Sequence, residues 1–256
     1  MSILDQIVAT KRDEVAELKR CRPDLLNSSP QRNRRRRFIR AFETGFGTIA
    51  EVKKASPSRG IIRSDFDPVE LAVQFEEAGA AALSVLTDGP YFQGSPEFIP
   101  LIRNRVSLPI LRKEFIIDPI QIAESAELGA DAILLIQAIL SPSDCQNLLD
   151  IAHHFGLDVL LEVHTDAELD SALSLSNLDM IGINNRDLQT FDVDISLARR
   201  LRQKIGKIHP ELPVVAESGY QHIDDLKTLA TEAFSAVLIG EGLATNPHLM
   251  AQLRLV

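Results

Sequence analysis

The chain has 256 residues, of which 45% are apolar and 25% charged, and its formal net charge is −9. This composition is that of an ordinary globular protein. The acidic balance argues against general binding to nucleic acid. Cys21 and Cys145 form no CxxC motif and no disulfide framework, which favours a reducing cytoplasm. No secretory signal pattern opens the chain, and no apolar run approaches the ~20 residues that span a membrane.

The first segment is predicted to be a helix that precedes the first strand. Ser2 and Asp5 form a capping-box pattern, apolar residues follow at helical spacing, and Pro23 ends the helix. Arginines then occupy positions 32, 34, 35, 36, 37 and 40. Because the rest of the chain is acidic, we favour a solvated, helix-compatible linker for this run, with an anion or nucleic-acid contact as the alternative. We predict one barrel domain over residues 1–256, with residues 1–46 as its N-terminal helical extension.

From residue 48 on, short apolar and β-branched runs alternate with amphipathic segments of helical period. The runs predict strands at 48–53, 81–87, 109–114, 131–136, 158–163, 180–184, 213–217 and 236–240. The segments between them predict helices at 68–79, 96–106, 119–129, 141–156, 166–176, 194–207, 221–232 and 245–255. Such alternation is typical of parallel strands, and eight units in about 210 residues indicate a closed (β/α)8 TIM barrel. A doubly wound open sheet is the alternative, but residues 54–60 hold too few glycines for its phosphate-binding turn.

Charged and hydroxyl side chains stand at the carboxyl ends of the predicted strands. Active sites of TIM barrels lie at this end, so we expect these side chains to converge on one cavity. Glu51 and Lys53 share one face of the first strand, where buried charges are unfavourable unless they are paired or used. The further candidates are Ser56, Lys113, Glu162, Asn184, Arg186, Glu217 and Ser218. A lysine ammonium beside a glutamate carboxylate can transfer protons, although each residue alone fits an ordinary loop or ion pair.

The last two strands end in glycines, within Ser218-Gly219 and Gly240-Glu241-Gly242. Glycines let backbone N–H groups approach a ligand, and a short helix after the last strand can point its N-terminus at an anion. This is the usual phosphate position in such barrels, with two ordinary turns as the alternative. The chain has no Walker-type loop, and its histidines lack metal-ligand spacing, so we predict no metal site.

Five short motifs follow in chain order at the ends of predicted strands: Glu51-Val-Lys-Lys-Ala-Ser-Pro-Ser58, Leu111-Arg-Lys-Glu-Phe115, Leu161-Glu-Val-His164, Gly182-Ile-Asn-Asn-Arg-Asp-Leu188 and Ala216-Glu-Ser-Gly219. With the opening helix, they resemble the indole-3-glycerol-phosphate synthase family over nearly the whole chain. The resemblance implies a barrel of ribulose-phosphate-binding type and a carboxy-lyase of tryptophan biosynthesis. The implied substrate is 1-(2-carboxyphenylamino)-1-deoxyribulose 5-phosphate. The products would be indole-3-glycerol phosphate, carbon dioxide and water, with no metal or organic cofactor.

The resemblance also implies a role for each matching residue. Lys113 would be the general acid at the ketone, and Lys53 would lie near the substrate carboxylate and protonate the leaving hydroxyl. Glu162 would be the base or cation stabiliser, and Glu51 would hold the two lysines. Asn184 and Ser218 would support these catalytic residues. The implied substrate contacts are Ser56, Phe92, Phe115, Leu134, Arg186, Glu217, Gly219, Leu238, Gly240 and Glu241.

Two other interpretations stay open. Another phosphosugar barrel, such as an isomerase, should use an acid–base pair of Cys or Asp type, whereas the first strand offers Glu51 and Lys53. A catalytically inactive barrel could serve as a binding or regulatory subunit. The presence of every charged residue at the strand ends argues against this interpretation. We therefore expect a cytoplasmic, monomeric enzyme for a small phosphosugar-anthranilate substrate, with no nucleic-acid or membrane partner. The arginine run is unusual for the family, and one hypothesis is that it attracts the anionic substrate.

Overall fold

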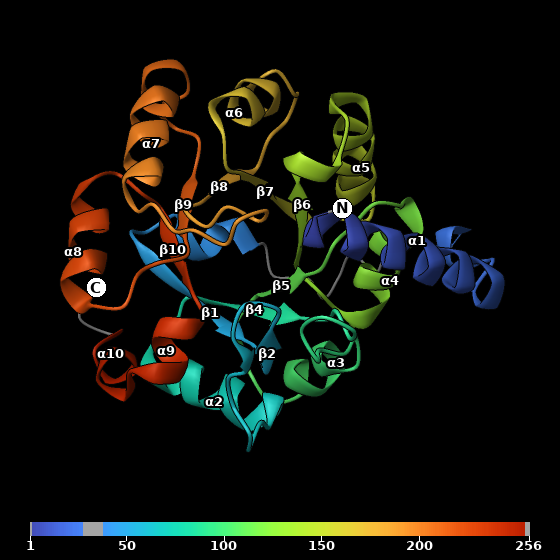
Figure 1. Cartoon of the computed structure of the whole chain (residues 1–256), viewed down its shortest axis with the longest axis horizontal. Helices are drawn as coiled ribbons and strands as arrows, with labels where there is room; N and C mark the ends of the chain where they lie inside the picture. The colour runs from blue at the N-terminus through green and yellow to red at the C-terminus, as the bar shows by residue number, and fades with distance from the viewer. Residues whose placement is uncertain (1, 28–37, 254–256) are drawn as a thin grey trace.

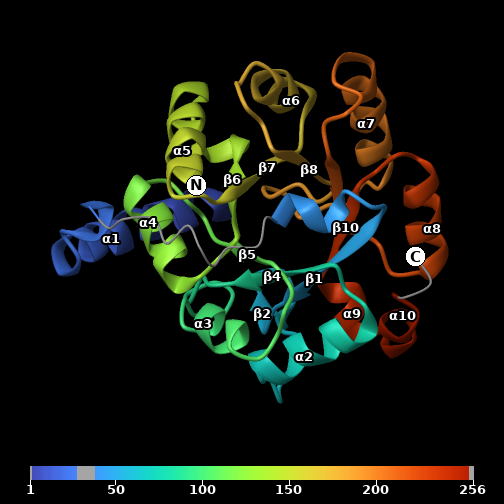
Figure 2. The same cartoon turned by 180° about the vertical axis from the view of Figure 1, so that it is seen from behind.

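The computed structural model describes residues 2–27 and 38–253, and Figure 1 shows their helices arranged around a central ring of strands. Figure 2 shows the same arrangement from behind. The arginines at positions 32–37 lie outside the described residues, so the interpretation of that run stays a prediction. Arg40 is described, and it is exposed.

Eight parallel strands close into a barrel. Each strand pairs with the next one along the chain, and the last strand pairs with the first, so Gly47 lies opposite Ala236 while Ile49 lies opposite Ala82. This closure confirms the predicted (β/α)8 TIM barrel and excludes the open sheet. The strands are β1 (Gly47–Val52), β4 (Ala82–Leu86), β5 (Ile110–Lys113), β6 (Ala132–Ile136), β7 (Asp158–Val163), β8 (Met180–Asn184), β9 (Val214–Glu217) and β10 (Ala236–Ile239).

Helices follow the barrel strands and cover the outside of the barrel (Figure 1). Side-chain caps and prolines set where several of them begin; Asp67, for example, accepts hydrogen bonds from the first turn of α2. Gly79 and Gly129 end α2 and α4 in the left-handed conformation. The helices are α2 (Pro68–Ala78), α3 (Phe98–Arg103), α4 (Pro119–Leu128), α5 (Pro142–His154), α6 (Asp166–Leu173), α7 (Ser196–Ile208), α8 (Ile223–Thr231), α9 (Glu241–Thr245) and α10 (Pro247–Ala251).

Two predicted helices were wrong in extent. The helix predicted over 96–106 is the shorter α3, because residues 95–97 form a turn in which Ser95 O accepts the Phe98 N–H. In the range of the helix predicted over 245–255, the structure has the shorter α10, which is separated from α9 at Asn246, and residues 254–255 lie outside the described residues. The backbone of Asn246 is not helical because a proline follows it, and its side chain caps α10. A short antiparallel hairpin, β2 (Ala55–Ser56) with β3 (Gly60–Ile61), was not predicted.

The elements before β1 contact the barrel on its outside and at the amino ends of its strands. α1 (Ile3–Cys21) begins with the predicted capping box, in which the Asp5 N–H donates to Ser2 Oγ over 3.1 Å. It lies beside α4, where Lys19 Nζ is 2.6 Å from Asp118 Oδ2. After η1 (Leu25–Asn27), the helical turn η3 (Phe38–Phe42), light blue in Figure 2, lies at the amino ends of the strands. There the Ile39 N–H donates to Asp158 Oδ2 over 3.0 Å.

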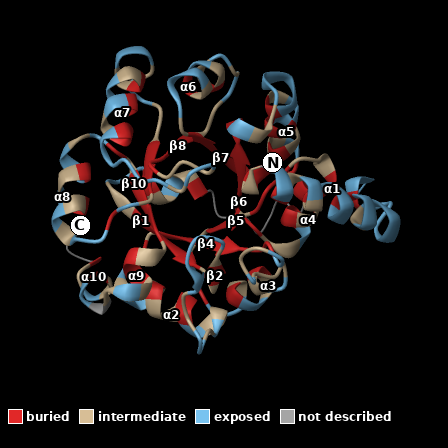
Figure 3. Cartoon of the chain, viewed as in Figure 1, coloured by how far each residue is buried: buried red, intermediate tan, exposed pale blue. Residues whose placement is uncertain are grey.

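The strands are buried on both faces, as Figure 3 shows by their red colour. Within one strand, Leu160 belongs to the apolar cluster inside the barrel and its neighbour Leu161 to the layer between the strands and the helices. Buried charges such as Glu162 and Glu217 interrupt this pattern near the carboxyl ends of the strands. In the described part of the chain, no helix is both long and apolar enough to cross a lipid bilayer.

Candidate active site

A cavity of about 400 Å³ opens at the carboxyl ends of the barrel strands. Every residue that the sequence predicted for the site lines this cavity. They are Glu51, Lys53, Ser56, Phe92, Lys113, Phe115, Leu134, Glu162, Asn184, Arg186, Glu217, Ser218, Gly219, Leu238, Gly240 and Glu241. The folding of a parallel barrel therefore brings together side chains that are almost 200 residues apart in sequence.

The side chain of Lys113 lies among three carboxylates at the bottom of the cavity. Its Nζ is 3.6 Å from Glu162 Oε2, 3.9 Å from Glu217 Oε2 and 4.0 Å from Glu51 Oε1. The three carboxylates come from β7, β9 and β1, while Lys113 is the last residue of β5. A single ammonium group is thus held between acids that come from separate parts of the barrel.

This arrangement determines the charge of Lys113. Burial alone would favour the neutral amine, but attraction to Glu162, Glu217 and Glu51 outweighs it and raises the pKa of Lys113. Burial likewise opposes ionisation of Glu51, yet Lys53 and Lys113 together lower the pKa of this carboxyl. Both groups are therefore charged at neutral pH, so that Lys113 has a proton to donate.

Glu217 differs from the other two acids. It is buried, and it lies beside Glu162, so burial and the repulsion between the two carboxylates raise the pKa of Glu217 well above its usual range despite Lys113. Two neighbouring carboxyls of this kind share a proton. Of the three acids beside Lys113, Glu217 is therefore the one whose protonated form its surroundings favour.

Asn184 connects the carboxylate cluster to the loop after β8. Its Nδ2 donates to Glu162 Oε1 over 3.2 Å, and its Oδ1 accepts the Arg186 N–H over 3.0 Å. On the other side, Nδ1 of His164 lies 2.7 Å from the Asn184 carbonyl oxygen. Asn184 is therefore held from both sides, which fixes the direction of the Glu162 carboxylate.

Glycines provide space for two of the acids. A β-carbon at Gly182 would overlap Glu217 Oε1, and one at Gly240 would overlap Glu51 Oε2 and lie 3.0 Å from Lys53 Nζ. Lys53 itself pairs closely with Glu51 Oε2. Gly240 was predicted only as a phosphate contact, and Gly182 was not predicted as a site residue. The sequence carries a signal for Gly182, because a glycine inside a strand often marks a close approach of another group.

One end of the cavity is formed by backbone turns and arginines. Ser218 and Gly219 have positive φ angles of 66° and 92°, and α9 begins with Glu241, directly after β10 and Gly240. The Glu241 carboxylate lies 2.8 Å from Arg59 Nη2 and 3.6 Å from Arg186 Nη2. Arg59 was missed by the sequence analysis, which assigned its segment only small polar residues.

Part of the cavity wall is apolar. The rings of Phe92 and Phe115 have centroids 6.0 Å apart, and Leu134 and Leu238 line the cavity with them. The loop after β8 adds further apolar residues that the sequence analysis did not select: Leu188, Phe191 and Val193. A bridge between Arg186 and Val193 folds this loop back. Three apolar side chains in a predicted loop were the signal available in the sequence.

Across residues 2–27 and 38–253, no three His, Cys, Asp or Glu side chains are placed so that they could hold a metal ion. His153 Nε2 lies 2.7 Å from Asp179 Oδ2, in an ion pair away from the cavity. Cys21 is exposed, Cys145 is buried, and both are free thiols.

Comparison with known proteins gives one consistent result. Residues 4–256 match the family described as indole-3-glycerol phosphate synthase. A relative of that name from Chlorobium luteolum is 46% identical over 254 residues, which cover 97% of this chain and 95% of the relative. Relatives of the same name from Chlorobaculum tepidum and Acinetobacter baylyi are 44% and 42% identical, over 97% and 96% of this chain and 98% and 92% of theirs. The chain therefore belongs to the indole-3-glycerol phosphate synthase family, whose members are carboxy-lyases of tryptophan biosynthesis, as its motifs predicted.

Proposed function

We propose that the cavity closes the indole ring of 1-(2-carboxyphenylamino)-1-deoxyribulose 5-phosphate, with Lys113 as the general acid. The observation that carries this proposal is the Lys113 ammonium within 4.0 Å of three carboxylates. Ring closure requires protonation of the ketone oxygen, and a buried ammonium is a proton donor held in place for that step. Loss of carbon dioxide and of one water then gives indole-3-glycerol phosphate.

In this proposal, Lys53 and Glu162 carry out the proton transfers that follow ring closure. Lys53 binds the substrate carboxylate together with Ser56 and protonates the leaving hydroxyl. Glu162 stabilises the cation formed on closure or removes the last ring proton. Its direction is set by Asn184, whose amide donates to Glu162 Oε1. Glu51 holds both lysines through its two carboxylate oxygens.

Substrate binding in this proposal follows the two ends of the cavity. The phosphate lies at the backbone N–H groups after Ser218 and Gly240, with the start of α9 pointing at it. The aromatic ring lies against Phe92 and Phe115, with Leu134 and Leu238 beside them. Arg186, Glu217 and Gly219 complete the polar contacts. Placed this way, the ketone carbon lies between the ends, near Lys113.

Replacement of single lysines by methionine tests the assignment. The activity of wild type is followed by the indole fluorescence that appears after addition of the aminodeoxyribulose phosphate. Lys113→Met should lower kcat by roughly 10²-fold or more, as expected for loss of a general acid, and Lys53→Met should also be impaired. Lys54→Met is the matched control, because Lys54 adjoins Lys53 but does not line the cavity. Full activity of Lys113→Met, or no turnover by wild type, would overturn the proposal.

We also propose that residues 1–256 form a single domain that acts as a monomer in the cytoplasm and binds no nucleic acid. The net charge of −9 supports the absence of nucleic-acid binding, and the two free cysteines support the cytoplasm. Light scattering at several protein concentrations tests the monomer, and a mass near twice that of the chain would contradict it.

A further inference from the structure

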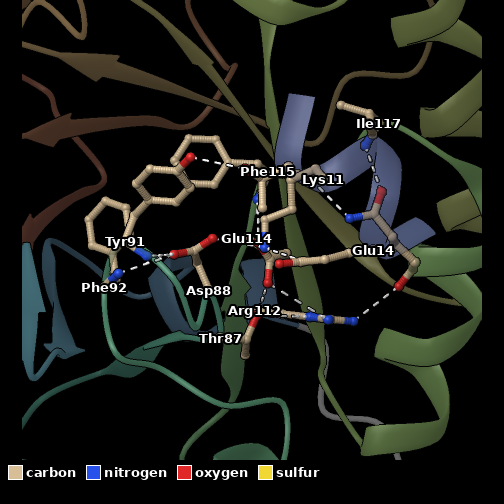
Figure 4. Close-up of polar contacts among 12 residues, drawn as sticks. Lys11, Glu14, Thr87, Asp88, Tyr91, Phe92, Arg112, Glu114, Phe115 and Ile117 are labelled. Carbon is tan, nitrogen blue, oxygen red and sulfur yellow. Dashed lines mark hydrogen bonds and ion pairs between the residues drawn. The ribbon is translucent and has the colours of Figure 1, made fainter. Parts of the chain in front are cut away.

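A second buried charge cluster lies beside the cavity, between α1 and the ends of β4 and β5 (Figure 4). Lys11 Nζ is 2.8 Å from Asp88 Oδ2, 3.1 Å from Glu114 Oε1 and 2.6 Å from Glu14 Oε2. Only 1% of Lys11 is exposed, whereas lysines are almost never fully buried unless they are paired. Lys11 is therefore the cation through which the N-terminal helix contacts the barrel at this point.

The two barrel carboxylates that contact Lys11 also hold the backbone of the aromatic wall. Asp88 Oδ1 accepts the Phe92 N–H over 3.1 Å, and Glu114 Oε1 accepts the Phe115 N–H over 2.9 Å (Figure 4). These two phenylalanines are the ones whose rings lie 6.0 Å apart in the cavity. One lysine thus joins the two segments that present the aromatic wall.

The two carboxylates depend on Lys11 to different degrees. Glu114 has other partners, since its Oε2 accepts a hydrogen bond of 2.6 Å from Thr87 and lies 3.9 Å from Arg112 Nη2. Among the ion pairs of the described residues, Asp88 takes part only in the one with Lys11, whose Nζ lies 2.8 Å from Asp88 Oδ2, while Asp88 Oδ1 accepts the Tyr91 and Phe92 N–H groups. Loss of the Lys11 charge would therefore act first on the loop that begins at Asp88 and carries Phe92.

The same side of α1 makes further contacts with this loop and wall. Thr10 Oγ1 lies 2.9 Å from the hydroxyl oxygen of Tyr91. Leu4 and Ile7, from the first two turns of α1, belong to the apolar cluster that contains Phe115. α1 therefore contacts the loop that carries Phe92 through a polar group, and it shares one apolar cluster with Phe115.

We infer that Lys11 is a positioning residue that fixes the Phe92 loop against Phe115, so that the N-terminal helix sets the width of the pocket for the substrate's aromatic ring. The inference rests on the proposed function, because it takes the ring to lie between these phenylalanines. Lys11 should therefore affect binding of the substrate's aromatic ring. It should not affect binding of the phosphate, which lies across the cavity at Gly219 and Gly240.

Lys11→Met, which keeps the length of the side chain and removes its charge, tests this inference. We expect KM for the aminodeoxyribulose phosphate to rise about tenfold while kcat stays within about threefold, because the ring is held less precisely but Lys113 is unchanged. The dissociation constant of indole-3-glycerol phosphate should rise to a similar extent. Its indole fluorescence reports this directly, because the chain contains no tryptophan. Competitive inhibition by inorganic phosphate should stay unchanged.

Three further variants separate positioning from general destabilisation. Lys11→Arg keeps the charge and should restore KM. Asp88→Asn keeps the acceptor for the Phe92 N–H but weakens the pair with Lys11, so it should reproduce the rise in KM even if Lys11→Met folds poorly. Lys19→Met is the matched control, because it removes an ion pair between α1 and α4 away from the wall. Equal KM values in Lys11→Met, Asp88→Asn and Lys19→Met would overturn the inference.

Amide hydrogen exchange provides a measurement that does not depend on the reaction. Residues 88–94 should exchange faster in Lys11→Met and Asp88→Asn than in Lys19→Met. Unchanged exchange in this segment would overturn the positioning role. A wild type that shows no turnover, together with faster exchange in these variants, would contradict the proposed function and leave the role of Lys11 in place.

Discussion

The carboxylate of Glu217 occupies the space that a side chain at residue 182 would fill. A β-carbon at Gly182 would overlap Glu217 Oε1 and would lie 3.3 Å from Leu160 Cδ1. The glycine on β8 therefore allows Glu217, on β9, to reach Lys113 at 3.9 Å. The absence of a side chain at Gly182 thus determines where the Glu217 side chain lies.

Gly182→Ala is expected to displace Glu217 and to lower kcat/KM by about 10²-fold, because small misplacements in an active site have effects of this size. Steady-state kinetics with the aminodeoxyribulose phosphate measure the effect. Gly206→Ala in α7 is the matched control, since its β-carbon would meet only the flexible end of Arg202. The control should keep its activity and gain up to ~1 kcal/mol of unfolding free energy. Wild-type kcat/KM in Gly182→Ala would contradict the prediction.

The raised pKa of Glu217 predicts how stability depends on pH. Above its usual pKa of 4.5, the carboxyl is ionised in the unfolded chain and still protonated in the folded protein. The folded state then binds more protons, so the stability due to this group falls as pH rises, by at most ~1.4 kcal/mol per pH unit. Glu217→Gln removes this dependence. The variant should therefore gain stability relative to wild type as pH rises above 4.5.

Glu51→Gln should change the pH dependence of folding stability in the opposite direction. The pKa of Glu51 is lowered, so its stabilising contribution is present above its usual pKa of 4.5 and is lost as pH falls below that value. Relative to wild type, Glu51→Gln should be least stable near neutral pH and should approach wild type on acidification. Urea unfolding of the three proteins between pH 3 and 8 measures both effects. Parallel pH profiles for the two variants would refute the assignment of opposite shifts.

The sequence predicted which residues line the cavity better than it predicted the contacts that support them, and the reason is geometric. Side chains at the carboxyl ends of parallel strands meet in any closed barrel, so Lys113 and Glu162 could be assigned to one cavity without coordinates. The approach of Glu217 to Gly182 depends on the register of two strands, which the apolar pattern does not specify. The partners of Lys11 depend on where α1 lies against the barrel, which its helical period leaves open.

The remaining differences between the predicted and the observed structure lie in turns and loops. The bend at Asn246 follows from the proline after it, a local signal that was available in the sequence. The hairpin of Ala55 with Ile61 and the folded loop from Arg186 to Val193 have short pairings and no regular period. Segments of this kind are determined by contacts with their surroundings, so Arg59 could not be selected beforehand.

Glu241 affects the charge at the phosphate end of the cavity. Its carboxylate lies 2.8 Å from Arg59 and 3.6 Å from Arg186, where it competes with a bound anion for both arginines. Glu241→Gln should tighten competitive inhibition by inorganic phosphate about fivefold, since one charge at short range in water is worth ~1 kcal/mol. Glu232→Gln breaks a comparable ion pair with Arg199 outside the cavity and should leave inhibition unchanged. Unaltered or weaker inhibition in Glu241→Gln would show that its carboxylate does not compete with the anion.

Ser218 has a strained backbone conformation, and it also lines the cavity. Its φ of 66° lies in the left-handed region, as does the φ of 59° at the exposed Ala233. Glycine adopts this conformation without strain, so Ser218→Gly and Ala233→Gly should change unfolding free energy to a similar extent, by no more than about 1–2 kcal/mol. Only Ser218→Gly removes a hydroxyl that lines the cavity, so it alone should lower kcat/KM, by roughly 10-fold for one lost hydrogen bond. Equal kcat/KM values in the two variants would mean that Ser218 supports only the turn before Gly219.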